Sequence, residues 1–240
     1  MGRVIDIRRY MGAKGGSGLP YDAEVEYLQS DGTQWIELGI YGSNDLDFTI
    51  DFEPLDLTET NRTWTGTGSY FGVRAGYNYE LSGYNRSTTL KGCFFFYTYS
   101  DASGYTKTVG LTSTRQTVSK RGTNLIRPDG SSASLQNGTV EYTTTQTIVA
   151  YAKKTSSGNV STFGKMKLYS LKFEKNNETI LDLVPVRKGQ VGYLYDKISG
   201  TLFGNSGTGN FILGQDVTRG GGKSLVINML CGLSVERRAA

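Results

Sequence analysis

The sequence predicts an all-β protein built as a two-sheet antiparallel sandwich. Alternating apolar and polar residues recur in roughly a dozen short segments, about 8–12 residues apart and separated by turn residues, which is typical of sandwiches and barrels. The composition agrees with this, because the 240 residues include 32 glycines and 16 tyrosines but only 4 prolines. Long segments with helical periodicity are scarce, which also favours β-sheet with many turns.

The clearest strand is Asp47–Glu53. Its apolar residues Phe48, Ile50 and Phe52 share one face, its charged residues and a threonine share the other, and Pro54 ends it. The other expected strands are Glu24–Leu28, Gln34–Leu38, a Gly-interrupted run over Trp64–Leu81, Gly92–Tyr99, Thr106–Leu111, Arg115–Lys120, Ser132–Gln136, Thr139–Thr143, Thr147–Ala152, Gly164–Glu174 and Thr179–Val184.

Several connections between these strands can also be predicted. Thr106–Leu111 and Arg115–Lys120 are expected to form a hairpin, and Asn137-Gly138 is a strong signal for a second hairpin. The aromatic run Gly92–Tyr99 is apolar at both parities, which indicates a central strand covered on both faces. The mixed parity of the strand that follows residue 164 predicts a β-bulge near Ser170.

The stretch over residues 189–211, GQVGYLYDKISGTLFGNSGTGNF, reads as strand, tight turn, short strand and Gly-rich loop. Asp196 is placed to accept hydrogen bonds from the amides of the turn, and Gly200 is placed to supply a positive φ. Such a stretch cannot bury its apolar side alone, so we expect it to complete a larger sheet.

Composition excludes several kinds of chemistry. The chain has no histidine, which removes the commonest general base, the commonest metal ligand and any Ser-His-Asp triad. Only Cys93 and Cys231 are present, too few for a zinc site made of Cys and His. No apolar run approaches the roughly 18 residues of a membrane span. We therefore expect no metal, no cofactor and no membrane insertion.

Charge is concentrated at the two ends of the chain. Residues 1–20 carry a net charge of +3 and residues 215–240 carry +2, which leaves −1 for residues 21–214. This division predicts an N-terminal arm or linker over residues 1–20, a sandwich domain over 21–214 and a C-terminal docking tail over 215–240. Basic ends on a nearly neutral body fit either docking arms for an acidic partner or solubilising tails. Nucleic acid is not expected, because the basic residues are few and no aromatic platform lies among them.

If the ends dock, both charged and apolar side chains are available for contact with a partner. The candidate docking residues are Arg3, Arg8, Arg9, Lys14, Arg219, Lys223, Leu225 and Ile227.

Carboxylates on one strand face raise the question of glycoside hydrolysis. Asp47, Asp51 and Glu53 share a face, but Thr49 interrupts the Glu-x-Asp-x-Glu spacing that endoglucanases of sandwich fold use. The interpretation is a solvated outer face, and we expect no catalytic residues.

Glycan binding is a second possibility, because sugars are held by aromatic faces together with a few polar groups. The candidate glycan-binding residues are Trp64, Tyr70, Arg74, Tyr77 and Tyr79, which lie in Gly-rich short strands or loops. The same mixture also fits core and cross-strand packing, and the sequence leaves both readings open.

Three segments carry a resemblance to a known family. VEYLQSDGTQWIELGI, GKMKLYSLKF with the following LVPVR, and GYLYDKISGTLFGNSGTGNF together resemble a concanavalin A-like (LamG-type) jelly-roll domain. Domains of this kind occur in tailed phages of gut bacteria and in bacterial surface proteins. The resemblance spans about residues 22–214 and implies a two-sheet antiparallel sandwich used in glycan binding, adhesion or virion decoration. It brings no catalytic residues.

Together these features predict a non-enzymatic structural protein of a phage virion, either a capsid decoration protein or a head-fibre component. Its partners would be other virion proteins, in the shell or the fibre, reached through the terminal arms within a multimeric assembly. The first 18 residues lack the apolar region of a secretory signal peptide, so we expect the protein on the virion surface. The alternative is an extracellular module that attaches to host or mucosal carbohydrate.

Overall fold

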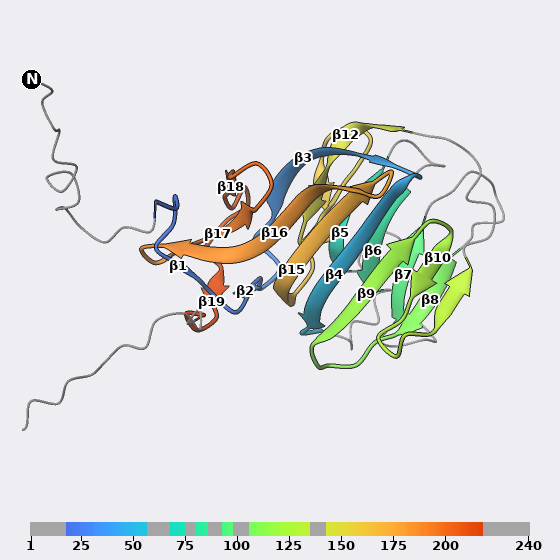
Figure 1. Ribbon diagram of the computed structural model, residues 1–240, viewed down its shortest axis with the longest axis horizontal. Helices are drawn as coiled ribbons and strands as arrows, with labels where there is room; N and C mark the ends of the chain where they lie inside the picture. The colour runs from blue at the N-terminus through green and yellow to red at the C-terminus, as the bar shows by residue number, and fades with distance from the viewer. Residues whose placement is uncertain are drawn as a thin grey trace, which may run out of the picture.

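A computed structural model describes residues 18–56, 68–74, 80–85, 93–97, 106–134 and 143–217. This part of the chain forms two β-sheets packed face to face, so the predicted all-β sandwich is confirmed (Figure 1). Within the same residues no helix is long and apolar enough to cross a membrane.

The larger sheet forms the front layer in Figure 1. Its order is β11 (Ser132–Ser134), β10 (Asn124–Ile126), β9 (Gln116–Arg121), β4 (Leu46–Pro54), β15 (Met166–Lys175), β16 (Glu178–Lys188), β17 (Val191–Asp196) and β18 (Leu202–Phe203). Three short strands complete it: β1 (Ala23–Glu24) pairs with β16, and β2 (Leu28–Gln29) pairs with β15 and with β19 (Ile212–Leu213). All of these pairings are antiparallel.

The smaller sheet forms the second layer. Its order is β14 (Val160–Ser161), β13 (Lys153–Lys154), β5 (Ser69–Arg74), β6 (Glu80–Asn85), β7 (Cys93–Tyr97) and β8 (Thr106–Gly110), and β12 (Thr143–Ala150) joins β3 (Ile36–Ser43) to β5. The pairing of β13 with β5 is parallel and the others are antiparallel. β7 has a neighbouring strand on each side, β6 and β8. That both faces of the aromatic run are covered stays a prediction, because the burial of its side chains lies outside the described residues.

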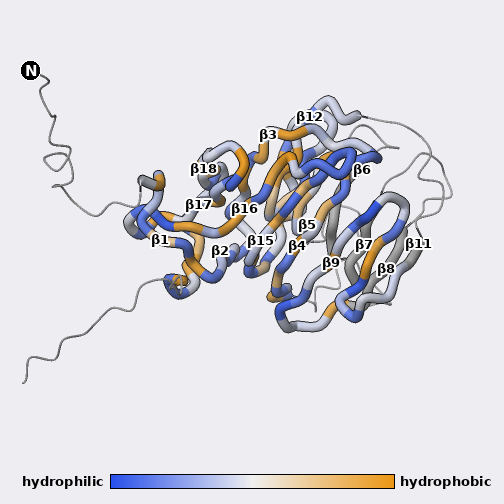
Figure 2. Tube along the Cα trace, viewed as in Figure 1, coloured by the Kyte–Doolittle hydropathy of each residue, from blue (hydrophilic) through white to orange (hydrophobic). Residues whose placement is uncertain are grey.

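The apolar faces of the two sheets meet in one core. Phe48, Ile50 and Phe52 of β4 are fully buried, whereas the residues between them are half-buried on the outer face, as the alternation predicts. Phe71 of the smaller sheet packs edge-to-face against Phe48, with 4.9 Å between ring centroids. Apolar and polar stretches alternate along the strands in Figure 2. The core therefore follows directly from the period-2 pattern of the sequence.

The turn after β17 has the predicted chemistry. The carboxylate of Asp196 accepts hydrogen bonds from the backbone N–H groups of Asp182, Ile198 and Ser199, at 2.8, 3.2 and 2.9 Å. Gly200 has a φ of 75°. Burial alone would raise the pKa of Asp196, but these hydrogen bonds lower it from its ordinary value. A carboxylate thus fixes the turn and ties it to β16.

The Gly-rich loop that follows packs against the segment before β3. Ser206 donates its backbone N–H to the carbonyl of Trp35 at 2.8 Å, and Thr208 donates to the carbonyl of Thr33 at 3.1 Å. A Cβ added at Gly207 would lie 2.2 Å from the Thr33 carbonyl oxygen, so the close approach requires glycine. The GTQW and GNSGTGN segments thus pack on each other across the sandwich.

One predicted connection is wrong. β8 and β9 do not form a hairpin, because β8 pairs with β7 in the smaller sheet and β9 pairs with β4 in the larger. The loop between them crosses from one layer to the other, and the side chain of Gln116 holds it by donating to the carbonyls of Thr112 at 2.7 Å and Thr114 at 3.1 Å. Alternation shows that a segment is a strand, but it does not name the partner strand.

Three other local predictions, a bulge, a strand and a turn, have different outcomes. The bulge is confirmed: the register of β15 against β4 shifts between Leu168 and Ser170, which leaves Tyr169 as the extra residue. The single strand expected over Glu24–Leu28 is instead two short strands, β1 and β2, with different partners. The turn Asn137-Gly138 lies outside the described residues.

Candidate functional site

A row of polar side chains follows the outer face of β4. Asp47, Thr49, Asp51 and Glu53 alternate with the buried residues and are half-exposed. Neighbouring side chains on this face come from β9 and β15, and Lys167 for example pairs with Glu53. We call this surface of the larger sheet the polar face.

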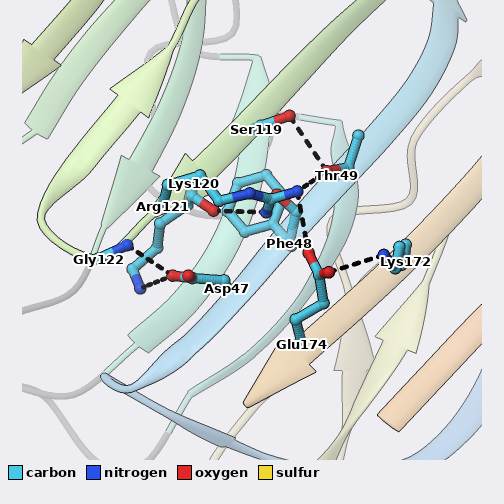
Figure 3. Close-up of polar contacts among 9 residues, drawn as sticks. All are labelled: Asp47, Phe48, Thr49, Ser119, Lys120, Arg121, Gly122, Lys172 and Glu174. Atoms are coloured by element: carbon cyan, nitrogen blue, oxygen red, sulfur yellow. Dashed lines mark hydrogen bonds and ion pairs between the residues drawn. The ribbon is translucent and has the colours of Figure 1, made fainter. Parts of the chain in front are cut away.

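At one end of the polar face a lysine enters the protein interior. Lys120 pairs with Phe48, and its side chain is only 2% exposed. Its Nζ donates to the Asp47 carboxylate at 3.1 Å (Figure 3). It also donates to the Leu46 carbonyl at 2.7 Å. The backbone N–H of Gly122 donates to the same Asp47 oxygen at 2.8 Å. Burial lowers the pKa of Lys120, and the pairing with Asp47 opposes that shift.

Next to this pair an arginine joins all three strands. Arg121 of β9 donates to the Thr49 hydroxyl at 2.7 Å and to the Phe48 carbonyl at 3.0 Å, both on β4. It also forms an ion pair with Glu174 of β15 at 2.9 Å. Glu174 accepts a second cation, Lys172, at 2.6 Å (Figure 3). The side chains thus connect strands that are already joined by their backbones.

Further along, an arginine is fixed on a tyrosine ring. Both Nε and Nη2 of Arg115 donate to the two oxygens of Asp51, with Nη2 at 2.7 Å. The guanidinium carbon lies 4.0 Å from the ring centroid of Tyr169, the bulged residue. A planar guanidinium in a bidentate pair and a stack has little rotational freedom left.

A second tyrosine and a lysine complete this group. The Tyr169 hydroxyl donates to one oxygen of Glu53 at 3.1 Å, and Lys167 donates to the other at 2.9 Å. Tyr27 packs edge-to-face on Tyr169 with 5.6 Å between centroids, and Lys167 Nζ lies 5.0 Å from the Tyr27 centroid. Burial and the hydrogen bond to Glu53 raise the pKa of Tyr169 to about 12, so its hydroxyl keeps its proton at neutral pH.

The polar face is thus an ordered array of donors and acceptors. Each of the three carboxylates of β4 is bonded to a different cation. Glycoside hydrolysis instead requires two carboxyl groups that act together, one of them as a proton donor. Sequence reasoning found the carboxylates but missed their partners, which come from segments distant in the chain.

The glycan-binding residues predicted from the sequence do not form a described surface. Trp64, Tyr77 and Tyr79 lie outside the described residues. Tyr70 is 2% exposed, and its ring packs against Phe52 in the core with 4.6 Å between centroids, so its assignment to an exposed rim is corrected. Arg74 is half-buried at the end of β5. The prediction for Tyr70 is wrong because glycines interrupt the alternation of apolar and polar residues in this run, so the sequence did not indicate which face of the sheet Tyr70 occupies.

The predicted docking residues of both ends also lie outside the described residues, but the points where these segments join the sandwich are described. Backbone bonds hold the two points side by side: Val217 donates to the Glu24 carbonyl at 2.8 Å, and Glu26 donates to the Gln215 carbonyl at 2.9 Å. The described chain therefore begins and ends at the same end of the sandwich, beside β1 and β19 (Figure 1).

An ion cluster reinforces this end. Arg187 of β16 donates through Nε and Nη2 to the two oxygens of Asp216, both at 2.6 Å, and lies 3.9 Å from Asp22. The pairing with Asp216 raises the pKa of Arg187 and lowers that of Asp216. Asp22 also accepts the backbone N–H of Gly189 at 2.7 Å. One arginine thus joins the first and last described segments to the centre of the larger sheet.

Comparison with known proteins finds no match for this chain among family models, curated proteins or solved structures.

Proposed function

We propose that this chain is a non-enzymatic structural protein of a phage virion. In this proposal its concanavalin A-like sandwich faces outward, and its two basic terminal segments attach it to other virion proteins, either shell or fibre subunits. The observation that supports this most strongly is the common exit of both ends beside β1 and β19.

The distribution of net charge along the chain supports a docking role for this common exit. Residues 1–17 carry a net charge of +3, residues 218–240 carry +3, and residues 18–217 carry −2. All of the excess positive charge is therefore joined to one end of a slightly acidic body. Such an asymmetry would orient the protein on an acidic surface.

Two tethers at one place also act together. When one segment is bound, the second is held at a high effective concentration near the same surface, so weak contacts add to a stable attachment. Tails that only increase solubility gain nothing from a shared exit. The geometry therefore favours docking over the alternative of solubilising tails.

The test is incorporation into particles. We expect chains that lack residues 1–17 or residues 218–240 to be present in fewer copies per particle, and a chain that lacks both to be absent. Thermal unfolding of each truncated chain should match that of the full chain. A matched pair separates charge from length: changing Arg3, Arg8 and Arg9 to lysine should preserve incorporation, whereas changing them to glutamine should reduce it. Normal copy number of the doubly truncated chain would refute the proposal.

A second candidate function is adhesion to host or mucosal carbohydrate. The observation that favours it is the pair of tyrosines, Tyr27 and Tyr169, placed among charged side chains on the polar face. Binding of the full chain to immobilised glycans tests this candidate independently of any particle.

A further inference from the structure

The polar face contains one group in which aromatic rings and ion pairs occur together. We call it the aromatic–ion cluster, and it consists of Tyr27, Asp51, Glu53, Arg115, Lys167 and Tyr169. We propose that this cluster is a binding site for an uncharged saccharide. The inference rests on the glycan-binding candidate and adds to it the site and the chemical class of the ligand.

The cluster lies where a ligand can reach it. It belongs to the outer face of the larger sheet, opposite the core, and is assembled from β4, β15, the residue before β2 and the residue before β9. The Arg115 side chain is 57% exposed, and the tyrosines are half-buried. The rings of Tyr27 and Tyr169 meet at 68°, so they present differently inclined surfaces to the C–H groups of a sugar ring.

Hydrogen-bonding capacity remains after the internal bonds are made. Arg115 uses Nε and Nη2 for Asp51, which leaves the donors of Nη1 outside that pair. Lys167 uses one of its three donors for Glu53, and each Glu53 oxygen has a further lone pair. Sugar hydroxyls both donate and accept, so they match an array that offers both kinds of group.

The charge of the cluster selects among saccharides. Arg115 and Lys167 contribute two positive charges, and Asp51 and Glu53 contribute two negative charges, so the six residues are neutral in sum. The nearby Glu26 adds a negative charge, which disfavours uronic, sialylated or sulfated ligands. An uncharged saccharide meets no such repulsion.

Backbone geometry provides an independent reason to assign a site here. The bulge makes Tyr169 the extra residue of β15, and it lies where this strand changes its neighbour from β2 to β16. β-Bulges are enriched beside functional sites, where they re-aim a side chain. The bulge allows Met166 and Leu168 before it, and Leu171 and Phe173 after it, to face the core. It leaves the Tyr169 side chain in contact with Arg115 and Glu53.

The cluster is also ordered before any ligand binds. The bidentate pair, the stacked guanidinium and the hydroxyl bond to Glu53 each remove rotamer freedom in the free protein. Less side-chain entropy is then lost on binding, which favours affinity.

The experiment uses the full chain on an array of oligosaccharides. Uncharged probes built from glucose, galactose, mannose and N-acetylglucosamine are compared with sialylated and sulfated ones. We expect binding to uncharged probes and affinity lowered about tenfold or more by Tyr169→Ala, because the ring surface is lost. Tyr169→Phe keeps the ring and should cost less. Tyr41→Ala is the matched control, because Tyr41 is 55% exposed on β3 of the other sheet.

Thermal unfolding of each variant shows whether it is folded, and Arg115→Lys, which keeps the charge but loses the planar stack, serves if Tyr169→Ala unfolds. Absence of binding to every probe would overturn both the glycan-binding candidate and this inference. Binding that Tyr169→Ala or Arg115→Lys leaves unchanged, or that Tyr41→Ala reduces equally, would overturn the site assignment alone. Binding restricted to charged probes would overturn the proposed ligand class.

Discussion

The buried pair of Lys120 and Asp47 provides a sharp test of the packing described here. Lys120 is 2% exposed, whereas the Asp47 side chain is 23% exposed. Removing Asp47 leaves a buried cation that, among the described residues, keeps the Leu46 carbonyl as its acceptor. Removing Lys120 leaves a carboxylate that reaches solvent and still accepts the N–H of Gly122. The two deletions are therefore unequal in cost.

The expected magnitudes follow from this asymmetry. Removing one partner of a buried pair costs about 3–5 kcal/mol when the charge left behind is buried and uncompensated. That cost is largely absent when the remaining charge reaches solvent. We expect Asp47→Ala to lower the free energy of unfolding by about 3 kcal/mol, and Lys120→Met to change it by less than about 1 kcal/mol. In a domain of this size, about 3 kcal/mol corresponds to a fall in Tm of about 6–12 °C. Urea denaturation at neutral pH measures both variants.

The same pair predicts a pH dependence. Because burial lowers the pKa of Lys120 in the folded protein, the unfolded chain binds more protons between that lowered pKa and the ordinary one. Between these two pKa values the contribution of Lys120 to the free energy of unfolding rises with pH. We expect Lys120→Met to abolish this rise. A larger loss for Lys120→Met than for Asp47→Ala, or an identical alkaline profile for wild type and Lys120→Met, would refute the reasoning.

Two further predictions concern the C-terminal motif of the sandwich. Gly207→Ala should destabilise the fold by about 1–3 kcal/mol, because its Cβ would meet the Thr33 carbonyl oxygen at 2.2 Å. Gly204→Ala, whose Cβ would lie 3.4 Å from Tyr193, is the matched control and should cost clearly less in the same denaturation assay. The lowered pKa of Asp196 means that its stabilising contribution is present above its ordinary pKa and is lost as pH falls through the folded value. The free energy of unfolding of the wild type should therefore fall as pH drops below about 4, and in Asp196→Asn this fall should be smaller. The same acid profile for both proteins would contradict this.

Much of the fold could be predicted because it depends on patterns of residues that are close in the sequence. The alternation along β4 assigned its buried and exposed residues, and the mixed parity of β15 located the bulge. The turn at Asp196 and Gly200 follows from the chemistry of two residues four positions apart. Each of these depends on side chains that are close in sequence.

The candidate sites could not be predicted because they depend on pairing between distant segments. Arg115 and Asp51 are 64 residues apart, and only the placement of β9 beside β4 brings them together. Lys120 occupies an inward position opposite Phe48. Its buried charge is compensated there by Asp47, which lies near the end of the neighbouring strand. Tyr169 could have been singled out, since a tyrosine at a predicted bulge in a polar strand is a signal of a re-aimed side chain.

Orientation on the particle tests the proposed function most directly. In an electron cryomicroscopy map of particles that carry this chain, we predict that the end of the sandwich beside β1 and β19, with Arg187 and Asp216, faces the particle and that the opposite end points away. A sandwich attached by its opposite end or by the polar face, with the β1 and β19 end facing solvent, would contradict the proposal.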